Sequence, residues 1–172
     1  MATQKYNMPQ GRKGDTYISP EFRKANQILP ELTSGTLESG EEYLIKEYKG
    51  SDVFTNVGAT KNETGHIFTA SGTTPTTWTG ASILVKIQNI SLSGASIRAQ
   101  LYKNGCLVKT FTTADDSIEI TDEAKGIFKF ADFIVAIDGT HVYDIEVTLS
   151  SGIVSTYFEG TWYFKKDITK SA

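Results

Sequence analysis

Short segments with alternating apolar and polar positions fill the second half of the chain. Most of them carry β-branched or aromatic residues, and Gly, Asn, Asp and Ser stand between them. Alternation with a period of two, interrupted by turn residues, is typical of antiparallel strands. The pattern therefore predicts an all-β body, either an antiparallel β-sandwich or a barrel. The expected strands are 83–92, 97–103, 107–113, 117–120, 126–130, 133–137, 142–149 and 153–164.

Two of these segments give sharper local predictions. Asn104 and Gly105 stand between two expected strands, and an Asn-Gly pair accepts the positive φ angles of a two-residue type I′ hairpin. In 142–149 every second residue is apolar. This strand should cover a core with one face and meet solvent with the other. Its expected inward residues are Tyr143, Ile145, Val147 and Leu149.

The last segment, 153–164, has aromatic residues at both even and odd positions. Two explanations stay open at this stage. Either Gly160 marks a β-bulge, or the strand is covered on both sides. In the second case the cover is the N-terminal part of the chain or a neighbouring subunit.

The N-terminal part of the chain shows no strand pattern. Residues 1–18 contain scattered charge without periodicity, which indicates an extended arm. A short helix is predicted over 20–29. Ser19 suits its N-cap, Pro20 suits the first helical position, and Pro30 would end it. Its apolar face would consist of Phe22, Ala25, Ile28 and Leu29.

Composition suggests four parts. The arm with its helix occupies 1–40, and its last residues are a linker rich in Ser-Gly turns. A small β module follows at 41–80 and begins with a strand near 43–48. The strand-rich body covers 81–166, and 167–172 form a tail.

Charge is distributed unevenly along the chain. Residues 1–30 carry a formal charge of +3, whereas the whole chain carries −3. A basic segment on an acidic body indicates docking onto an acidic partner, although solvation of scattered charges is the simpler explanation. The acidic body also argues against nucleic acid as a partner. The candidate docking residues of the arm are Tyr6, Arg12, Lys13, Tyr17, Phe22, Arg23, Ile28 and Leu29.

Side chains suited to catalysis or metal binding are scarce. His66 and His141 are the only histidines, and their turn-rich surroundings predict that both are exposed. No nucleotide-binding motif or Ser/His/Asp pattern accompanies them, and the single cysteine, Cys106, forms no disulfide within the chain. The acidic run 115–123 lacks the EF-hand pattern, which favours a solvated strand edge over a calcium site. We therefore expect no catalytic residue, no metal ion and no cofactor.

The two tryptophans receive different predictions. Trp162 lies inside the last strand, where a core position is expected. Trp78 follows two threonines and lies close to a glycine, which predicts an exposed ring. An exposed tryptophan can stack on a sugar ring, so Trp78 is the candidate glycan contact.

Residues 43–72 contain a spaced set of aromatic, acidic and glycine positions. The set reads Y-x-I … D-x-F … G-A … N … G-x-x-F-x-A-x-G. It resembles a small module that recurs in structural proteins of tailed bacteriophages, where the acidic residue and the first phenylalanine are adjacent; here Val53 separates them. Phe54 and Phe68 can anchor a miniature β-fold whose turns the glycines permit. The matching residues are Tyr43, Ile45, Asp52, Phe54, Gly58, Ala59, Asn62, Gly65, Phe68, Ala70 and Gly72.

This resemblance implies a virion structural protein without catalytic activity. The strand-rich body also looks like the immunoglobulin-like or jelly-roll sandwiches that phages use on capsids and tails. The first hypothesis is a capsid auxiliary or decoration protein that binds the major capsid protein or another virion protein through its arm. The second is a tail, collar or head-fibre component that binds host-surface glycans. A glycan-cleaving or cell-wall enzyme is a third.

Location and assembly follow from the same implication. No apolar run reaches membrane-spanning length and no secretory signal is recognisable, so we expect neither a membrane partner nor export. The protein would be assembled into virions in the cytoplasm of the host bacterium. Virion proteins repeat with the symmetry of the particle, which predicts a homo-oligomer or symmetry-repeated copies.

Overall fold

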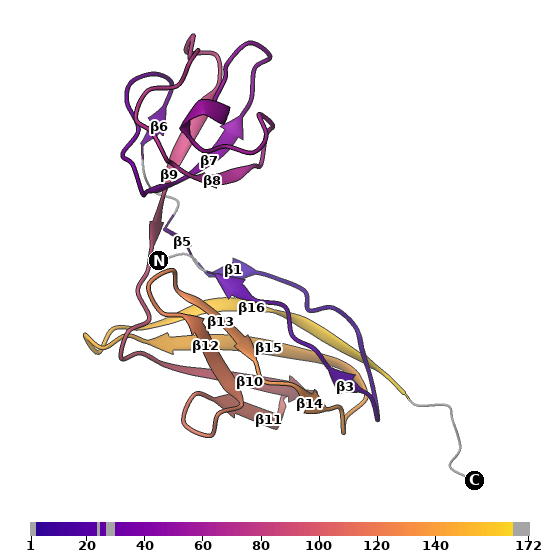
Figure 1. Cartoon of the computed structure of the whole chain (residues 1–172). Helices are drawn as coiled ribbons and strands as arrows, with labels where there is room; N and C mark the ends of the chain where they lie inside the picture. Colours follow the sequence, from indigo (N-terminus) through magenta and orange to yellow (C-terminus); the bar gives the residue numbers. More distant parts are fainter. Residues whose placement is uncertain (1–2, 24, 27–29, 167–172) are drawn as a thin grey trace. The chain divides into compact units, whose positions relative to one another are not determined.

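The computed structural model describes residues 3–23, 25–26 and 30–166 (Figure 1). Their regular structure is almost entirely β, in several mainly antiparallel sheets, and a 3-10 turn, η1 (Thr55–Val57), is the helical element found among them. No helix in these residues has the length and apolar character of a membrane span.

The chain folds into two units. Unit 1 consists of Met1–Lys24 and Ile90–Ala172, and unit 2 consists of Ala25–Asn89. Unit 2 is therefore an insertion in the sequence of unit 1. These boundaries differ from the expected 1–40, 41–80 and 81–166, because β9 (Ile83–Asn89) pairs with strands of unit 2 and the N-terminal residues pack in unit 1. The expected tail at 167–172 lies outside the described residues.

The large sheet of unit 1 has six strands. Four of them pair antiparallel in the order β16 (Val154–Lys165), β15 (Gly139–Thr148), β10 (Ser96–Lys103) and β11 (Cys106–Thr112). Two short strands, β1 (Gln4–Lys5) and β2 (Gly11–Arg12), pair in parallel with the other edge of β16. The N-terminal residues thus complete this sheet.

Two smaller sheets complete unit 1. One joins β12 (Ile118–Asp122), β13 (Ile127–Phe130) and β4 (Phe22–Arg23); the other pairs β14 (Phe133–Ile134) with β3 (Thr16–Tyr17). They share one aromatic core with the large sheet. Trp162 is fully buried in this core, as predicted. Its ring centroid lies 4.8–6.3 Å from those of Tyr17, Phe111, Phe130, Phe133, Tyr143 and Phe164.

The helix predicted over 20–29 is wrong for the residues that the structure describes. Phe22–Arg23 form β4, and Ala25–Asn26 form β5, which pairs with β9. Phe22 lies opposite Phe128, and the two rings stack with centroids 5.3 Å apart. A helix of about three turns has little stability of its own, so burial of this aromatic ring decides the local structure. Ile28 and Leu29 lie outside the described residues.

Two local predictions are confirmed in unit 1. Asn104 and Gly105 have φ angles of 52° and 78° between the paired residues Lys103 and Cys106, as a type I′ hairpin requires. Within the predicted strand 142–149, the inward side chains are buried or half-buried and the alternate ones are exposed or half-buried.

Gly160 and the bulge of the last strand are separate features. The register of β15 and β16 shifts so that Tyr157 is the extra residue, which allows both Tyr157 and Phe158 to be buried. Gly160 instead lies where the N-terminal segment crosses. A Cβ atom at this position would lie 1.9 Å from the carbonyl oxygen of Tyr6. The Tyr143 hydroxyl donates to that same oxygen at 2.6 Å.

Unit 2 consists of a small sheet and a set of long loops. β7 (Glu42–Glu47) pairs with β8 (Ile67–Thr69) on one side and with β9 on the other. β6 (Glu31–Leu32) and β5 (Ala25–Asn26) also pair with β9. The core of the unit consists of Leu37, Tyr43, Ile45, Phe54, Val57, Ala59, Phe68, Ala70 and Leu84.

Candidate functional site

A buried carboxylate organises the loops of unit 2. Asp52 is fully buried. Its Oδ1 atom accepts hydrogen bonds from the amide and the hydroxyl of Thr79, at 2.7 and 2.9 Å. Its Oδ2 atom accepts from the amide of Ser82 at 2.9 Å. Asp52 therefore fastens the loop before β9 to the segment after β7.

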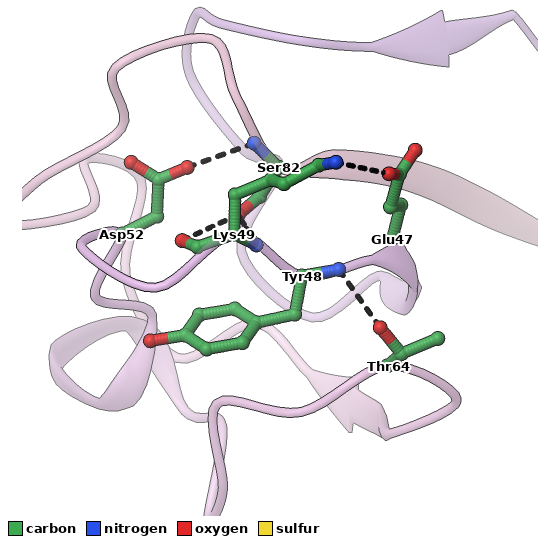
Figure 2. Close-up of polar contacts among 6 residues, drawn as sticks. All are labelled: Glu47, Tyr48, Lys49, Asp52, Thr64 and Ser82. Atoms are coloured by element: carbon green, nitrogen blue, oxygen red, sulfur yellow. Dashed lines mark hydrogen bonds and ion pairs between the residues drawn. The ribbon is translucent and has the colours of Figure 1, made fainter.

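Ser82 extends this network to the end of β7 (Figure 2). Its hydroxyl is also buried and accepts from the amide of Lys49 at 2.9 Å. Lys49 carries its ammonium group outward, where it forms an ion pair with Glu47 at 2.7 Å. The amide of Tyr48 donates to the hydroxyl of Thr64 at 2.9 Å. Side chains thus satisfy backbone groups that no strand pairing covers here.

The charge of Asp52 is stabilised, and both of its oxygens accept hydrogen bonds from protein groups. Burial alone would raise the pKa of Asp52, but the donors of Thr79 and Ser82 outweigh burial and hold the pKa below its ordinary value of 3.8. A general base needs a free oxygen that can reach a substrate proton. Both oxygens of Asp52 face protein donors inside the unit, so we assign the network a structural role.

Two asparagines fix the neighbouring loops in the same way. The Oδ1 atom of Asn62 accepts from the amide of Phe54 at 3.0 Å. Asn56 bridges to the loop at 74–76, donating to the carbonyl of Thr74 and accepting from the amide of Thr76, each at 2.9 Å. Val53 forms an isolated antiparallel bridge with Thr77, and its two neighbours Asp52 and Phe54 are both fully buried.

The aromatic anchors of unit 2 are confirmed, whereas Trp78 differs from its prediction. Phe54 and Phe68 are buried and stack with ring centroids 6.5 Å apart. Trp78 is half-buried and packs edge-on against Phe54 at 5.6 Å. Its Nε1 donates to the carbonyl of Ser82 at 3.0 Å. The candidate glycan contact is thus a partly covered element of the same loop network.

His141 is buried, so the prediction of an exposed turn residue is wrong. β15 begins at Gly139, earlier than expected, and the alternation of the strand points His141 inward. Burial lowers the pKa of His141, and the charge of Lys103 lowers it further. The ring contacts Phe164. His66 is half-buried and lies 3.2 Å from the hydroxyl of Thr60.

The acidic run 115–123 contains a local hydrogen-bond network. The hydroxyls of Ser117 and Thr112 donate to Asp115 and lower the pKa of this carboxyl to about 2. The carboxylate thereby closes the turn between β11 and β12. Among the residues that the structure describes, no group of three or more His, Cys, Asp or Glu side chains is placed to hold a metal ion.

The predicted docking residues differ in exposure. Tyr17 and Phe22 are buried in the core of unit 1, so a partner cannot reach these rings while the unit is folded. Arg23, half-buried, follows Phe22 in β4. Tyr6, Arg12 and Lys13 are exposed along the segment that pairs with β16. Ile28 and Leu29 lie outside the described residues.

An open groove of about 450 Å³ lies beside the exposed basic residues. Arg12 and Lys165 contribute cations to its lining, Asp15 contributes a carboxylate, and Ile18 contributes an apolar side chain. Sequence reasoning missed Ile18 and Lys165. Ile18 carried the weak signal of an isoleucine in a polar segment, but Lys165 joins Arg12 only through the pairing of β2 with β16.

In comparisons with protein-family models, curated proteins and solved structures, none matches the chain.

Proposed function

We propose that the protein is a structural component of a tailed-bacteriophage virion, acting by binding and not by catalysis. Within that class, a capsid auxiliary or decoration protein is the function that we favour. It would be assembled into particles in the host cytoplasm, in symmetry-repeated copies. The six-stranded and three-stranded sheets around one core support a β-sandwich body of the immunoglobulin-like or jelly-roll type.

The observation that carries the proposal is the set of contacts that the phage-like positions make within unit 2. Tyr43, Ile45, Phe54 and Phe68 are in its core. Asp52 and Asn62 accept hydrogen bonds from loop amides. Gly58 has a φ angle of 109°, and a Cβ atom there would lie 2.3 Å from the carbonyl oxygen of Thr69. Most positions of the spaced pattern are therefore buried or hydrogen-bonded within one small unit, which favours a true module over a chance match.

Attachment would use the exposed N-terminal edge of unit 1. Tyr6, Arg12 and Lys13 stay accessible there, while the buried rings of Tyr17 and Phe22 hold the segment in place. A partner would therefore meet a preformed basic edge, not an arm that becomes ordered on binding. Preformed surfaces lose less conformational entropy on binding.

The test has two steps. Mass spectrometry of purified particles from the source of the chain should detect the protein; its absence from intact particles would contradict the proposal. Particles that lack the protein should then bind the added wild-type protein in co-sedimentation. Arg12→Glu combined with Lys13→Glu should abolish binding. Lys109→Glu combined with Lys125→Glu, which changes the charge equally at exposed sites elsewhere on unit 1, should leave it intact.

The second proposal is a tail, collar or head-fibre component that binds host glycans. Trp78 lends it little support, because its ring packs on Phe54 and its N–H group is already hydrogen-bonded. Binding on a glycan array that is lost in Trp78→Ala, with unit 2 still folded, would favour this proposal over capsid attachment.

A further inference from the structure

The two most exposed large apolar side chains of the described residues lie in, or directly next to, one ribbon of unit 1. Ile18 is 76% exposed and Ile134 is 64% exposed. Ile134 pairs with Thr16 in the β3–β14 ribbon, and Ile18 lies two residues beyond Thr16. Tyr17 pairs with Phe133 in the same ribbon, their rings are in contact, and Tyr17 is buried. Alternation places Ile134 on the face of the ribbon opposite Phe133, and Ile18, which directly follows β3, also faces solvent.

Cations gather beside Ile18. Arg12 and Lys165 line the groove together with Ile18, and Lys13 and Lys166 are exposed next to them in the sequence. Carboxylates of this region include Asp15, which lines the groove, and Asp132, which precedes the ribbon and is exposed. Asp138, just before β15 and near the end of β16, forms an ion pair with Lys103. The surface thus combines an excess of positive charge with two uncovered apolar side chains.

The walls of the groove are held by backbone hydrogen bonds within unit 1. The amide of Lys13 donates to the carbonyl of Lys165 at 2.9 Å. The amide of Gly14 donates to the carbonyl of Val135 at 2.8 Å, and the amide of Val135 donates to the carbonyl of Asp15 at 3.0 Å. The backbone that borders the groove is therefore fixed within unit 1, so a partner would meet a preformed surface.

We infer that this groove, with Ile18 and Ile134 at its side, binds an extended acidic segment of a partner protein in which carboxylates alternate with apolar side chains. Arg12 and Lys165 would pair with the carboxylates, and the isoleucines would cover the apolar side chains. The inference rests on the proposed function in one respect, since it gives the chemistry of the partner at the attachment surface. Nucleic acid fits less well, because it offers no apolar side chain to cover two exposed isoleucines.

Fluorescence anisotropy of the full chain with synthetic peptides tests the inference without particles. The probe is a short fluorescein-labelled peptide of alternating glutamate and valine, and its counterpart has lysine in place of glutamate. The glutamate peptide should bind and the lysine peptide should not, with binding weakened by salt. Arg12→Ala combined with Lys165→Ala should weaken binding roughly tenfold, and Ile18→Ser combined with Ile134→Ser by a similar factor.

Matched controls lie elsewhere on unit 1. Lys109→Ala combined with Lys125→Ala, and Ile153→Ser at a side chain 57% exposed, should leave the affinity for the glutamate peptide unchanged. Equal binding of both peptides, no binding of either, or loss of binding in the controls would overturn the inference. Sedimentation provides a further check. If the chain self-associates and Ile18→Ser prevents this association, the inference is overturned, because the groove would then bind a second copy of the chain. If the peptide experiment fails but mass spectrometry detects the protein in particles, the inference is wrong and the proposed function is still supported.

Discussion

At the scale of single residues, Asp52 shows how a charge can be buried without an ion pair. An isolated carboxylate in a protein interior is strongly unfavourable. Asp52 avoids that cost because Thr79 and Ser82 direct two amides and a hydroxyl at its two oxygens. The same contacts give the loops of unit 2, which have little strand pairing, a fixed conformation.

We expect Asp52→Asn to destabilise unit 2 by about 2–3 kcal/mol, because the amide group of asparagine would face the amide of Ser82, donor against donor. Hydrogen exchange of the Ser82 amide and urea unfolding of the full chain would measure this loss. Asp116→Asn is the control, since Asp116 is exposed and asparagine tolerates its φ of 58°. An unchanged exchange rate at Ser82 in Asp52→Asn would contradict the assigned role.

The same variant should change the response to acid. Folding lowers the pKa of Asp52 below its ordinary value of 3.8. As the pH falls, Asp52 therefore takes up its proton in the unfolded chain before it does so in the folded chain. The stabilisation is present above that pH and is lost as the pH falls through the lower, folded value. Asp52→Asn should lack this component, so its urea midpoint should fall less than that of the wild type on acidification.

At the scale of elements, the strands were predictable where their side chains alternate. Strand 142–149 needs no knowledge of its neighbours, and the Asn104-Gly105 hairpin is encoded by two residues. The N-terminal strands have no such signal, because β1, β2, β3 and β4 contain two residues each. They exist through pairing with β16, β14 and β13, which are distant in sequence.

The candidate groove could not be predicted from the sequence, for the same reason. Residues of the basic segment could be named from charge alone. Its contact with Lys165, and the β3–β14 pairing that brings the segment before Ile18 next to Ile134, depend on long-range pairing. Charge patterns in a sequence identify which groups are available. They do not identify which groups share a surface.

Gly160 tests the attachment of the N-terminal segment. Gly160→Ala would place a methyl group 1.9 Å from the carbonyl oxygen of Tyr6, a backbone atom that cannot rotate away. We expect a loss of about 1–3 kcal/mol in unit 1 and faster hydrogen exchange of the amides of Tyr6 and Met8, which now bond to β16. Gly50→Ala, with no atom within 4 Å of its Cβ position, is the control. Unchanged exchange in Gly160→Ala would contradict the close approach.

At the scale of the whole molecule, the N-terminal residues belong to the body of unit 1. Met8, Tyr17 and Phe22 are core residues, and β1 and β2 cover the edge of β16. Removing residues 1–23 would expose this core and leave a strand edge unpaired. Loss of particle binding on such a deletion would therefore reflect unfolding as much as a lost contact. Substitutions at exposed residues of the groove are the informative test of attachment.

Unit 2 has the features of a separable module. It has its own core, and Ala25 and Asn89, its first and last residues, are direct partners in the β5–β9 pairing. Paired ends mean that a short turn can close the gap that unit 2 leaves in unit 1. We expect residues 25–89 to fold alone, and unit 1 to fold when a short Gly-Asn-Gly turn replaces them. Domains of this size do fold without disulfides, although with modest stability.

The tryptophans report on each product separately, because Trp78 is the only one in unit 2 and Trp162 the only one in unit 1. Each product should show a cooperative urea transition in its own fluorescence, and Asp52→Asn should shift the transition of the 25–89 product. Gly160→Ala should shift only that of the shortened unit 1. If the 25–89 product shows no cooperative unfolding transition while the shortened unit 1 folds, the inserted module needs contacts outside its own core. That result would contradict the prediction that unit 2 folds alone.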